Sequence, residues 1–159
     1  MNDLVFKNFH RAARAVLRES GINDFKIYRR PMSDISPAFV SIVGLVGGVK
    51  GYFLMEMCGT SALALVRSME GHLGTNAGDE DRTRWCKAAI AELSNQISGR
   101  ATALMANKRI DCMITPPTTL SGAAIESNLP ESDQQTRFTV KAAWGMIHCV
   151  VAIKNVKTL

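Results

Sequence analysis

The sequence has few of the residues that nucleic-acid binding, metal binding or membrane insertion require. Only 6% of its residues are aromatic, so side chains on which bases could stack are scarce. Its three histidines are far apart, and no His, Cys or carboxylate spacing is typical of a metal site. No apolar run approaches the ~20 residues that a membrane-spanning helix needs. These absences disfavour a nucleic-acid partner, a membrane span and a metal ion held by this chain.

The cysteines also lack the CxxC spacing of a metal or redox motif. They are Cys58, Cys86, Cys112 and Cys149. All four lie in apolar segments, so we expect buried, reduced thiols. The N-terminus opens with an acidic residue, Asp3, and arginines interrupt the residues after it, so no signal peptide is visible. We therefore expect a cytoplasmic protein.

What is present fits one globular domain with a basic surface. The chain has 159 residues, of which 47% are hydrophobic and 21% charged, and this length is enough to bury a core. The net charge of +5 at pH 7 would favour an acidic partner, although the basic residues are spread along the chain. A basic nucleic-acid-binding domain is kept as a remote alternative, which steep salt dependence of binding to generic DNA or RNA would reveal.

The predicted elements follow the same order in both halves of the chain, residues 1–78 and 79–159. Each half has a helix, a short strand ending at proline, a linker and a hairpin. The first half has a helix over 4–20, a strand over 25–30, a hairpin of 39–46 and 49–57 around Gly47-Gly48, and a second helix over 62–70. The second half has a helix over 79–108, a strand over 110–115, a long loop over 118–135, and a hairpin of 136–143 and 146–154 around Trp144-Gly145. We expect a single α+β domain built from two degenerate repeats, with a roughly six-stranded, mainly antiparallel sheet and long helices packed on it.

The predicted helix over 79–108 carries the polar residues that stand out most. Its apolar residues recur at three- and four-residue steps and form one stripe that must be buried. The stripe consists of Cys86, Ile90, Leu93, Ile97, Ala101 and Leu104. Glu92 and Asn95 lie near the opposite side, about 60° apart at ~100° per residue, and Ala88 and Gly99 share their sector. Small residues there would let another molecule approach closely, but the pattern alone fits an ordinary solvated surface equally well.

Charges mark both ends of this helix. Asp79, Glu80 and Asp81 lie where a first turn favours anions. Lys108 and Arg109 lie where a last turn favours cations. The helix is therefore expected to run from Asp79 to Lys108.

The acid and the amide have no counterpart in the first half of the chain. One alignment of the two halves places Lys7 and His10 at the positions of Glu92 and Asn95, and another places Phe6 and Phe9 there. Under either alignment, only the second half carries this pair.

A short motif and its surroundings resemble a known family. Residues 92–95 read Glu-Leu-Ser-Asn, Pro116 or Pro117 follows about twenty residues later, and residues 42–51 form a hydrophobic, glycine-rich hairpin. This combination resembles the CheC/CheX/FliY group of chemotaxis phosphatases, with the CheX branch closest, over most of the chain from about residue 38 onward. The family pattern often has Ser or Asp four residues before the glutamate, where this chain has Ala88.

The resemblance implies an activity and residue roles. It implies hydrolysis of the aspartyl phosphate on a CheY-like response-regulator receiver domain, a step in two-component signalling. Asn95 would hold the attacking water, and Glu92 would pair with the receiver's active-site lysine. An amide suits the first role because it has a donor, an acceptor and no charge to repel phosphoryl oxygens. A divalent cation, Mg²⁺, would belong to the receiver, so we expect no cofactor or metal of this chain's own, while Ala88 and Gly99 would contact the partner.

The resemblance leaves two matters open. A non-catalytic adaptor of the same fold would bind a receiver or a flagellar protein without hydrolysing it. A homodimer is also expected from the resemblance, and the predicted strand Met146 to Lys154 is a candidate for pairing across its two-fold axis.

Overall fold

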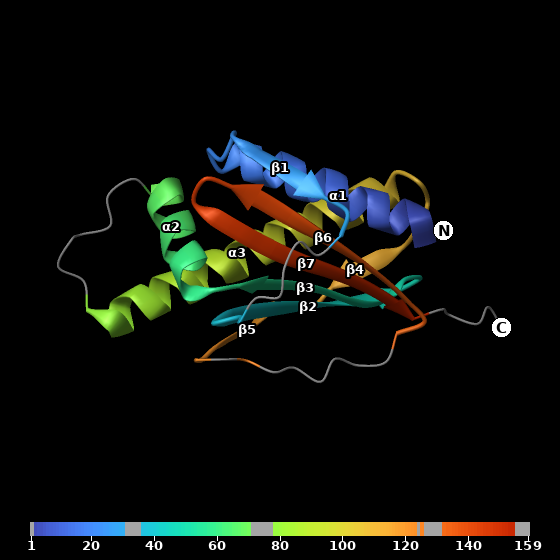
Figure 1. Cartoon of the computed structure of the whole chain (residues 1–159). Helices are drawn as coiled ribbons and strands as arrows, with labels where there is room; N and C mark the ends of the chain where they lie inside the picture. Colours follow the sequence, from blue (N-terminus) through green and yellow to red (C-terminus); the bar gives the residue numbers. More distant parts are fainter. Residues whose placement is uncertain (1, 31–35, 71–77, 124, 126–131, 155–159) are drawn as a thin grey trace.

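Seven antiparallel strands form one sheet, and three helices pack against it (Figure 1). The computed structural model describes residues 2–30, 36–70, 78–123, 125 and 132–154. In chain order the elements are α1 (Asn2–Glu19), β1 (Phe25–Tyr28), β2 (Phe39–Gly47), β3 (Lys50–Met57), α2 (Gly59–Glu70), α3 (Asp79–Ala106), β4 (Cys112–Ile114), β5 (Thr118–Ser121), β6 (Gln134–Ala142) and β7 (Gly145–Lys154). The strand order is β1-β6-β7-β3-β2-β4, and β5 also pairs with β2. The predicted α+β class and antiparallel sheet are confirmed.

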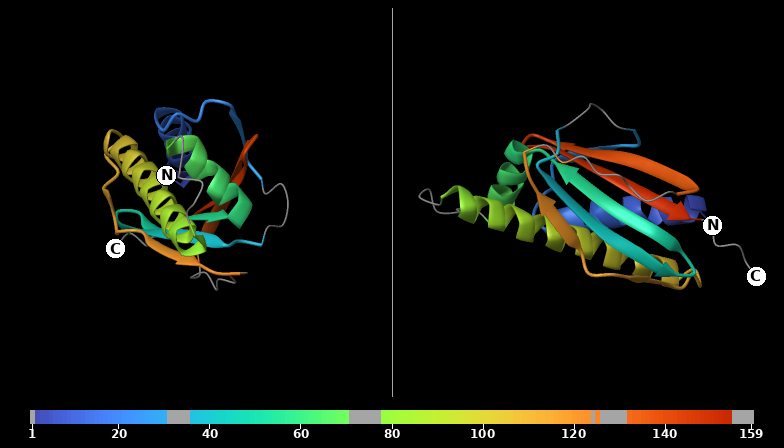
Figure 2. Two further views of the ribbon diagram at one scale, coloured as in Figure 1. Left: turned by 90° about the vertical axis from the view of Figure 1, so that its left-hand side faces the viewer. Right: turned by 90° about the horizontal axis from the view of Figure 1, so that it is seen from below.

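The main core lies between the helices and one face of the sheet (Figure 2). Alternation along β3 and β7 sends residues such as Phe53, Met55 and Val151 into this core. Helix α1 contributes Phe9, whose ring lies 5.0 Å from that of Phe53 between centroids. Helix α3 runs along the length of the sheet beside α1 (Figure 2), so α3 packs against both the sheet and α1.

The sheet has one strand more than expected. Thr118–Ser121 forms β5, although residues 118–135 were expected to be a loop, and β6 begins at Gln134 within the same stretch. The loop prediction is therefore wrong for these two ends, while residues 126–131 lie outside the described residues. Strand β5 consists mostly of polar residues, and its pairing with Phe39–Ile42 of β2 supplies the order that its own sequence does not.

Both hairpins are confirmed, but neither turn is centred where it was predicted. In the first, the pair Leu45↔Gly51 leaves residues 46–50 for the connection, which is centred on Gly48 rather than between Gly47 and Gly48. In the second, the pair Ala142↔Gly145 leaves residues 143–144 as the two-residue turn. Gly145 has a φ of 142° and directly follows that turn, so the glycine is needed beside the turn and not within it.

The terminal strand β7 lies in the middle of the sheet. It pairs with β6 on one side and with β3 on the other. Its backbone groups are therefore used within the chain, and the prediction that Met146 to Lys154 pairs across a two-fold axis is wrong. The homodimer itself stays a prediction, and it would need another surface.

The strand order reads the same after the two halves are exchanged. Exchanging β1 with β4, β6 with β2, and β7 with β3 reverses the order β1-β6-β7-β3-β2-β4 without changing any neighbour. This is the arrangement that two repeats of helix, short strand and hairpin would produce. The single domain with repeats over 1–78 and 79–159 stays a prediction.

The outer edge of β2 is covered by a strand in two pieces. Strand β4 pairs with Leu45–Gly47 and β5 with Phe39–Ile42. Two prolines separate the pieces and have no N–H to donate. Between them, the Thr115 N–H donates to the Gly44 carbonyl at 3.0 Å, and the Thr115 Oγ1 accepts from the Gly44 N–H at 2.8 Å. The side-chain oxygen of Thr115 thus accepts the hydrogen bond that a backbone carbonyl would accept in an unbroken strand pairing with β2.

Within the described residues, no helix combines the length and apolar character that a membrane crossing needs.

Candidate functional site

The long predicted helix exists and begins where expected. Helix α3 starts at Asp79, and three acidic residues occupy its first turn, where they stabilise the unpaired N–H groups. It ends at Ala106, because the N–H groups of Lys108 and Arg109 donate three residues back in a tighter turn and Arg109 adopts a φ of 60°. The prediction of cations in the last turn is therefore wrong: both basic residues lie beyond the helix.

The buried face of α3 is wider than the predicted stripe. Five of the six predicted stripe residues are buried: Cys86, Ile90, Leu93, Ile97 and Ala101. Leu104 is only half-buried, and Met105 takes the core position instead. The face shifts because 3.6 residues per turn drift relative to a strict seven-residue repeat. Ser94 and Ser98 are also fully buried and widen the face toward β2.

The four candidate residues lie together on the face of α3 that points away from the sheet. Glu92 and Ala88 are exposed, while Asn95 and Gly99 are half-buried. A Cβ built on Gly99 would meet no atom within 4 Å. The structure therefore brings the predicted acid, amide and small residues onto one accessible surface, which we call the α3 ridge.

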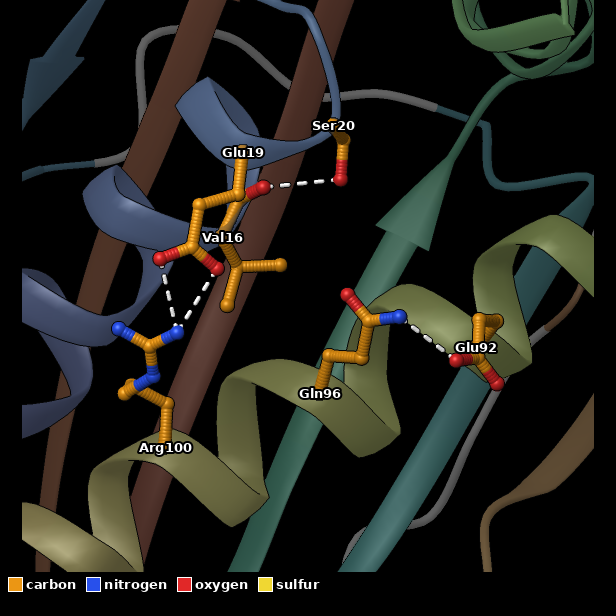
Figure 3. A network of polar contacts seen from close by, with 6 residues as sticks. All are labelled: Val16, Glu19, Ser20, Glu92, Gln96 and Arg100. Atoms are coloured by element: carbon orange, nitrogen blue, oxygen red, sulfur yellow. Dashed lines mark hydrogen bonds and ion pairs between the residues drawn. The ribbon is translucent and has the colours of Figure 1, made fainter.

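The carboxylate of Glu92 is held by a neighbour that sequence reasoning missed. Gln96 Nε2 donates to Glu92 Oε1 at 2.6 Å, one helical turn away (Figure 3). One turn further on, Arg100 pairs with Glu19 of α1 at 2.7 Å (Figure 3). The i, i+4 spacing of Glu92 and Gln96 was the available signal for the first contact. Among the described residues, no hydrogen-bond partner is found for the Asn95 side chain, which leaves its donor and acceptor available to a ligand.

A chain of hydroxyl groups fixes the turn of α3 that carries the acid and the amide. Ser94 Oγ donates to the Ala91 carbonyl at 3.0 Å and lies 2.7 Å from Ser41 Oγ of β2. Thr119 Oγ1 of β5 donates to Ser41 Oγ at 3.4 Å. Donation in the order Thr119, Ser41, Ser94, Ala91 satisfies all three hydroxyls. Since Ser94 lies between Glu92 and Asn95 in sequence, this buried chain sets the position of both.

These hydrogen bonds between hydroxyl groups could not be predicted from the sequence, because the residues that form them are far apart along it. Ser41 and Ser94 are 53 positions apart, and Thr119 lies in a strand that was expected to be a loop. The only local signal was a serine at a position on the buried side of the helix.

The α3 ridge consists of a carboxylate, an amide and two small residues, and these do not form a metal-binding site. Within the described part of the chain, no three His, Cys, Asp or Glu side chains gather closely enough to hold a cation. Chemically, the α3 ridge can accept a cation at Glu92 and can donate to and accept from a polar ligand at Asn95.

The sequence of the ridge and the strands around it matches a known family. The model of the chemotaxis phosphatase CheX matches residues 39–141, which is well over half of the chain. The chain belongs to the CheX family. Among curated proteins, it is similar to the CheY-P phosphatase CheX of Thermotoga maritima, with 32% identity over 91 residues, covering 56% of this chain and 55% of that protein. This CheX family member thus matches about half the length of that relative.

Solved structures show the same fold. The chain is similar to the CheX of Borrelia burgdorferi, solved as a CheX-CheY-BeF3-Mg²⁺ complex, with a TM-score of 0.82, 22% identity, and coverage of 94% of this chain and 97% of that one. It is also similar to the chemotaxis protein CheX of Vibrio vulnificus, with a TM-score of 0.78, 16% identity, and coverage of 94% and 96%. At these identities the likeness shows a shared CheX fold.

Proposed function

We propose that this chain is a phosphatase that hydrolyses the aspartyl phosphate of a CheY-type receiver domain. The observation that carries the proposal is the α3 ridge, where an exposed acid and an amide with no hydrogen-bond partner among the described residues lie one turn apart beside Gly99, which has open space above it. The family match and the name of the Thermotoga relative, a CheY-P phosphatase, support it. So does the likeness to a CheX that was solved with CheY, BeF3 and Mg²⁺.

In this proposal, catalysis rests on placing a water molecule. An aspartyl phosphate is already activated, so its hydrolysis needs a water held in line with the leaving oxygen. The Asn95 carboxamide would accept a hydrogen bond from that water and orient it, without a charge that repels the phosphoryl oxygens. The water oxygen bonds to phosphorus, the bond from phosphorus to the aspartyl oxygen breaks, and the receiver's carboxylate is regenerated with release of phosphate.

Glu92 has a different role in the proposed reaction. Beside an anionic phosphoryl group its carboxylate would be repelled, so we assign it to an ion pair with the receiver's active-site lysine. The hydrogen bond from Gln96 occupies Oε1 and leaves Oε2 for the lysine. Mg²⁺ would be supplied by the receiver, where it neutralises charge on the transferred group.

Phosphate release from a purified phosphorylated receiver tests the proposal. Wild-type protein should accelerate release, and Asn95→Ala should lower the turnover number by about 100-fold, the usual cost of losing one aligned contact to the transition state. Glu92→Ala should mainly raise the KM for the receiver, because the ion pair is formed on docking. Thr83→Ala is the matched control, since Thr83 is exposed on the same helix three turns away.

The adaptor alternative gives a different result in the same assay. An adaptor would bind the receiver without accelerating phosphate release, with either Asn95 or alanine at that position. If wild type and Asn95→Ala accelerate release equally, the role given to the amide is wrong.

A further inference from the structure

The surface of α1 is built on the same plan as the α3 ridge but with opposite charge. Lys7 is exposed, the two residues after it are buried, and His10 is half-buried. Glu92 and Asn95 of α3 show the same exposure, with two buried residues between them. Phe9 is fully buried, so Lys7 and His10, rather than Phe6 and Phe9, occupy the corresponding surface of α1.

Four residues of α1 form this surface, which we call the α1 ridge: Asp3, Lys7, His10 and Arg14. The spacing of 4, 3 and 4 residues places them in one row along the helix. Lys7 Nζ pairs with Asp3 Oδ2 at 2.8 Å, and the Arg14 guanidinium lies 5.9 Å from the centre of the Phe25 ring of β1. The row therefore faces the edge of the sheet formed by β1.

Arg29, the residue that follows β1, adds a further cation beside this row. Phe25 and Ile27 of β1 pack against the main core, and side chains two residues apart in an extended strand point the same way. Arg29 directly follows β1 and lines one cavity together with Lys7 and His10, so it lies on the helix side of the sheet. His10 packs edge-on against the Phe138 ring of β6 at 5.8 Å between centroids. Arg29 is exposed, and among the described residues no hydrogen bond or ion pair occupies its guanidinium.

A cavity of about 90 Å³ lies among these groups. It is lined by the first three residues of the α1 ridge together with Phe6, Arg29 and residues 136–138 of β6. This volume is well above the ~15 Å³ that seats one water, so it has room for one compact polyatomic ion. Arg137 is a lining residue, but its guanidinium donates to Gln135 Oε1, so we do not count it as a ligand.

The cations around the cavity act on its two titrating groups, Asp3 and His10. The pKa of the Asp3 carboxyl lies below its usual range, chiefly because Lys7 hydrogen-bonds to it and with help from Arg29. Burial lowers the pKa of His10, and the charges of Arg14 and Arg29 lower it further. Among the described residues of the lining, Asp3 is the one carboxylate and Lys7 and Arg29 are cations, so positive charge is in excess there.

We propose that Lys7 and His10 of the α1 ridge, together with Arg29, form a binding site for a small oxyanion, either free phosphate or the phosphate group of a small monoester. Arg29 supplies a planar fork of donors suited to two oxygens of such a group. Lys7 supplies a point charge and His10 one ring N–H. The site lies on a different helix from the α3 ridge and is independent of the phosphatase proposal.

Titration of the ¹⁵N-labelled full chain at constant ionic strength tests this site, with inorganic phosphate in one arm and glycerol 2-phosphate in the other. Saturable shifts of the Lys7, His10 and Arg29 amides are expected. Binding in both arms identifies the phosphate group as the ligand, whereas binding in one arm assigns the source. Arg29→Ala should weaken binding about tenfold, as for one charged hydrogen bond.

Two further variants separate a site from general charge attraction. Arg11→Ala removes the same charge from an exposed position of α1 outside the cavity and should change the affinity less than about twofold. Asp3→Asn removes the carboxylate that pairs with Lys7, so Lys7 becomes available to phosphate and binding should become tighter. Absence of saturable shifts at tens of millimolar phosphate would overturn the proposal, and so would equal weakening by Arg29→Ala and Arg11→Ala.

Discussion

Replacing Gly99 with alanine should stabilise the protein, although the residue lies on the proposed working surface. Gly99 lies inside α3 without a positive φ, and an added Cβ would meet no atom within 4 Å. Glycine in a helix interior costs about 1 kcal/mol relative to alanine. The free energy of unfolding should therefore rise by about 1 kcal/mol, and Tm by about 3 °C for a chain of this size.

The same substitution at a second glycine should have the opposite effect. Gly51 has a φ of 157°, and an added Cβ would lie 1.9 Å from the Ala152 carbonyl oxygen of the neighbouring strand. Relief of that overlap requires movement of the β3–β7 pairing, so Gly51→Ala should cost at least about 2 kcal/mol. Urea denaturation monitored by circular dichroism measures both changes.

The benefit of the open space at Gly99 should appear when a partner docks. A leucine there adds bulk one turn from Asn95, so Gly99→Leu should fold normally and raise the KM for a phosphorylated receiver. If Gly99→Ala lowers stability, the space above this residue is not open. If Gly99→Leu leaves the kinetics unchanged, the partner does not approach this turn.

Three further measurements test other parts of the structure. Ser94→Ala removes the link to Ser41, and the loss of one buried hydrogen bond should lower the free energy of unfolding by about 1 kcal/mol in urea; an unchanged midpoint would contradict the hydroxyl chain. Burial raises the pKa of the Cys58 thiol, but hydrogen bonds with the side chains and backbone of Ser61 and Thr60 together outweigh this effect and leave the pKa below its usual value. Burial raises the pKa of Cys149, so mass spectrometry should find iodoacetamide on Cys58 first and on Cys149 last, and the reverse order would refute this ranking. Burial and then a nearby guanidinium lower the pKa of His148, so the folded state binds fewer protons than the unfolded state below pH ~6.5; stability should fall as the pH drops from there, and His148→Gln should flatten that part of the curve.

The sequence was sufficient for the elements whose pattern is local. The apolar stripe of α3 and the alternation of the two hairpins predicted one long helix and four strands, and the spacing of Glu92 and Asn95 predicted their shared surface. The family resemblance added the fold and is confirmed by the match over residues 39–141.

The missed features depend on contacts between distant segments. Strand β5 has little apolar pattern and is ordered by β2. The hydroxyl chain from Thr119 to Ser94 joins three elements that no local pattern connects. The turn positions were also missed, because a glycine can serve beside a turn as well as within it, and cross-strand register decides which.

The two-piece border of the sheet has a consequence for behaviour at high concentration. An unbroken, flat border strand offers its free amide and carbonyl groups as a template on which another chain can add. Here one border is divided at two prolines, with the Thr115 side chain filling the gap, and the opposite border, β1, is only four residues long. Neither β1 nor the divided β4–β5 border offers a long ladder to a passing strand, so these two borders should resist the addition of another chain.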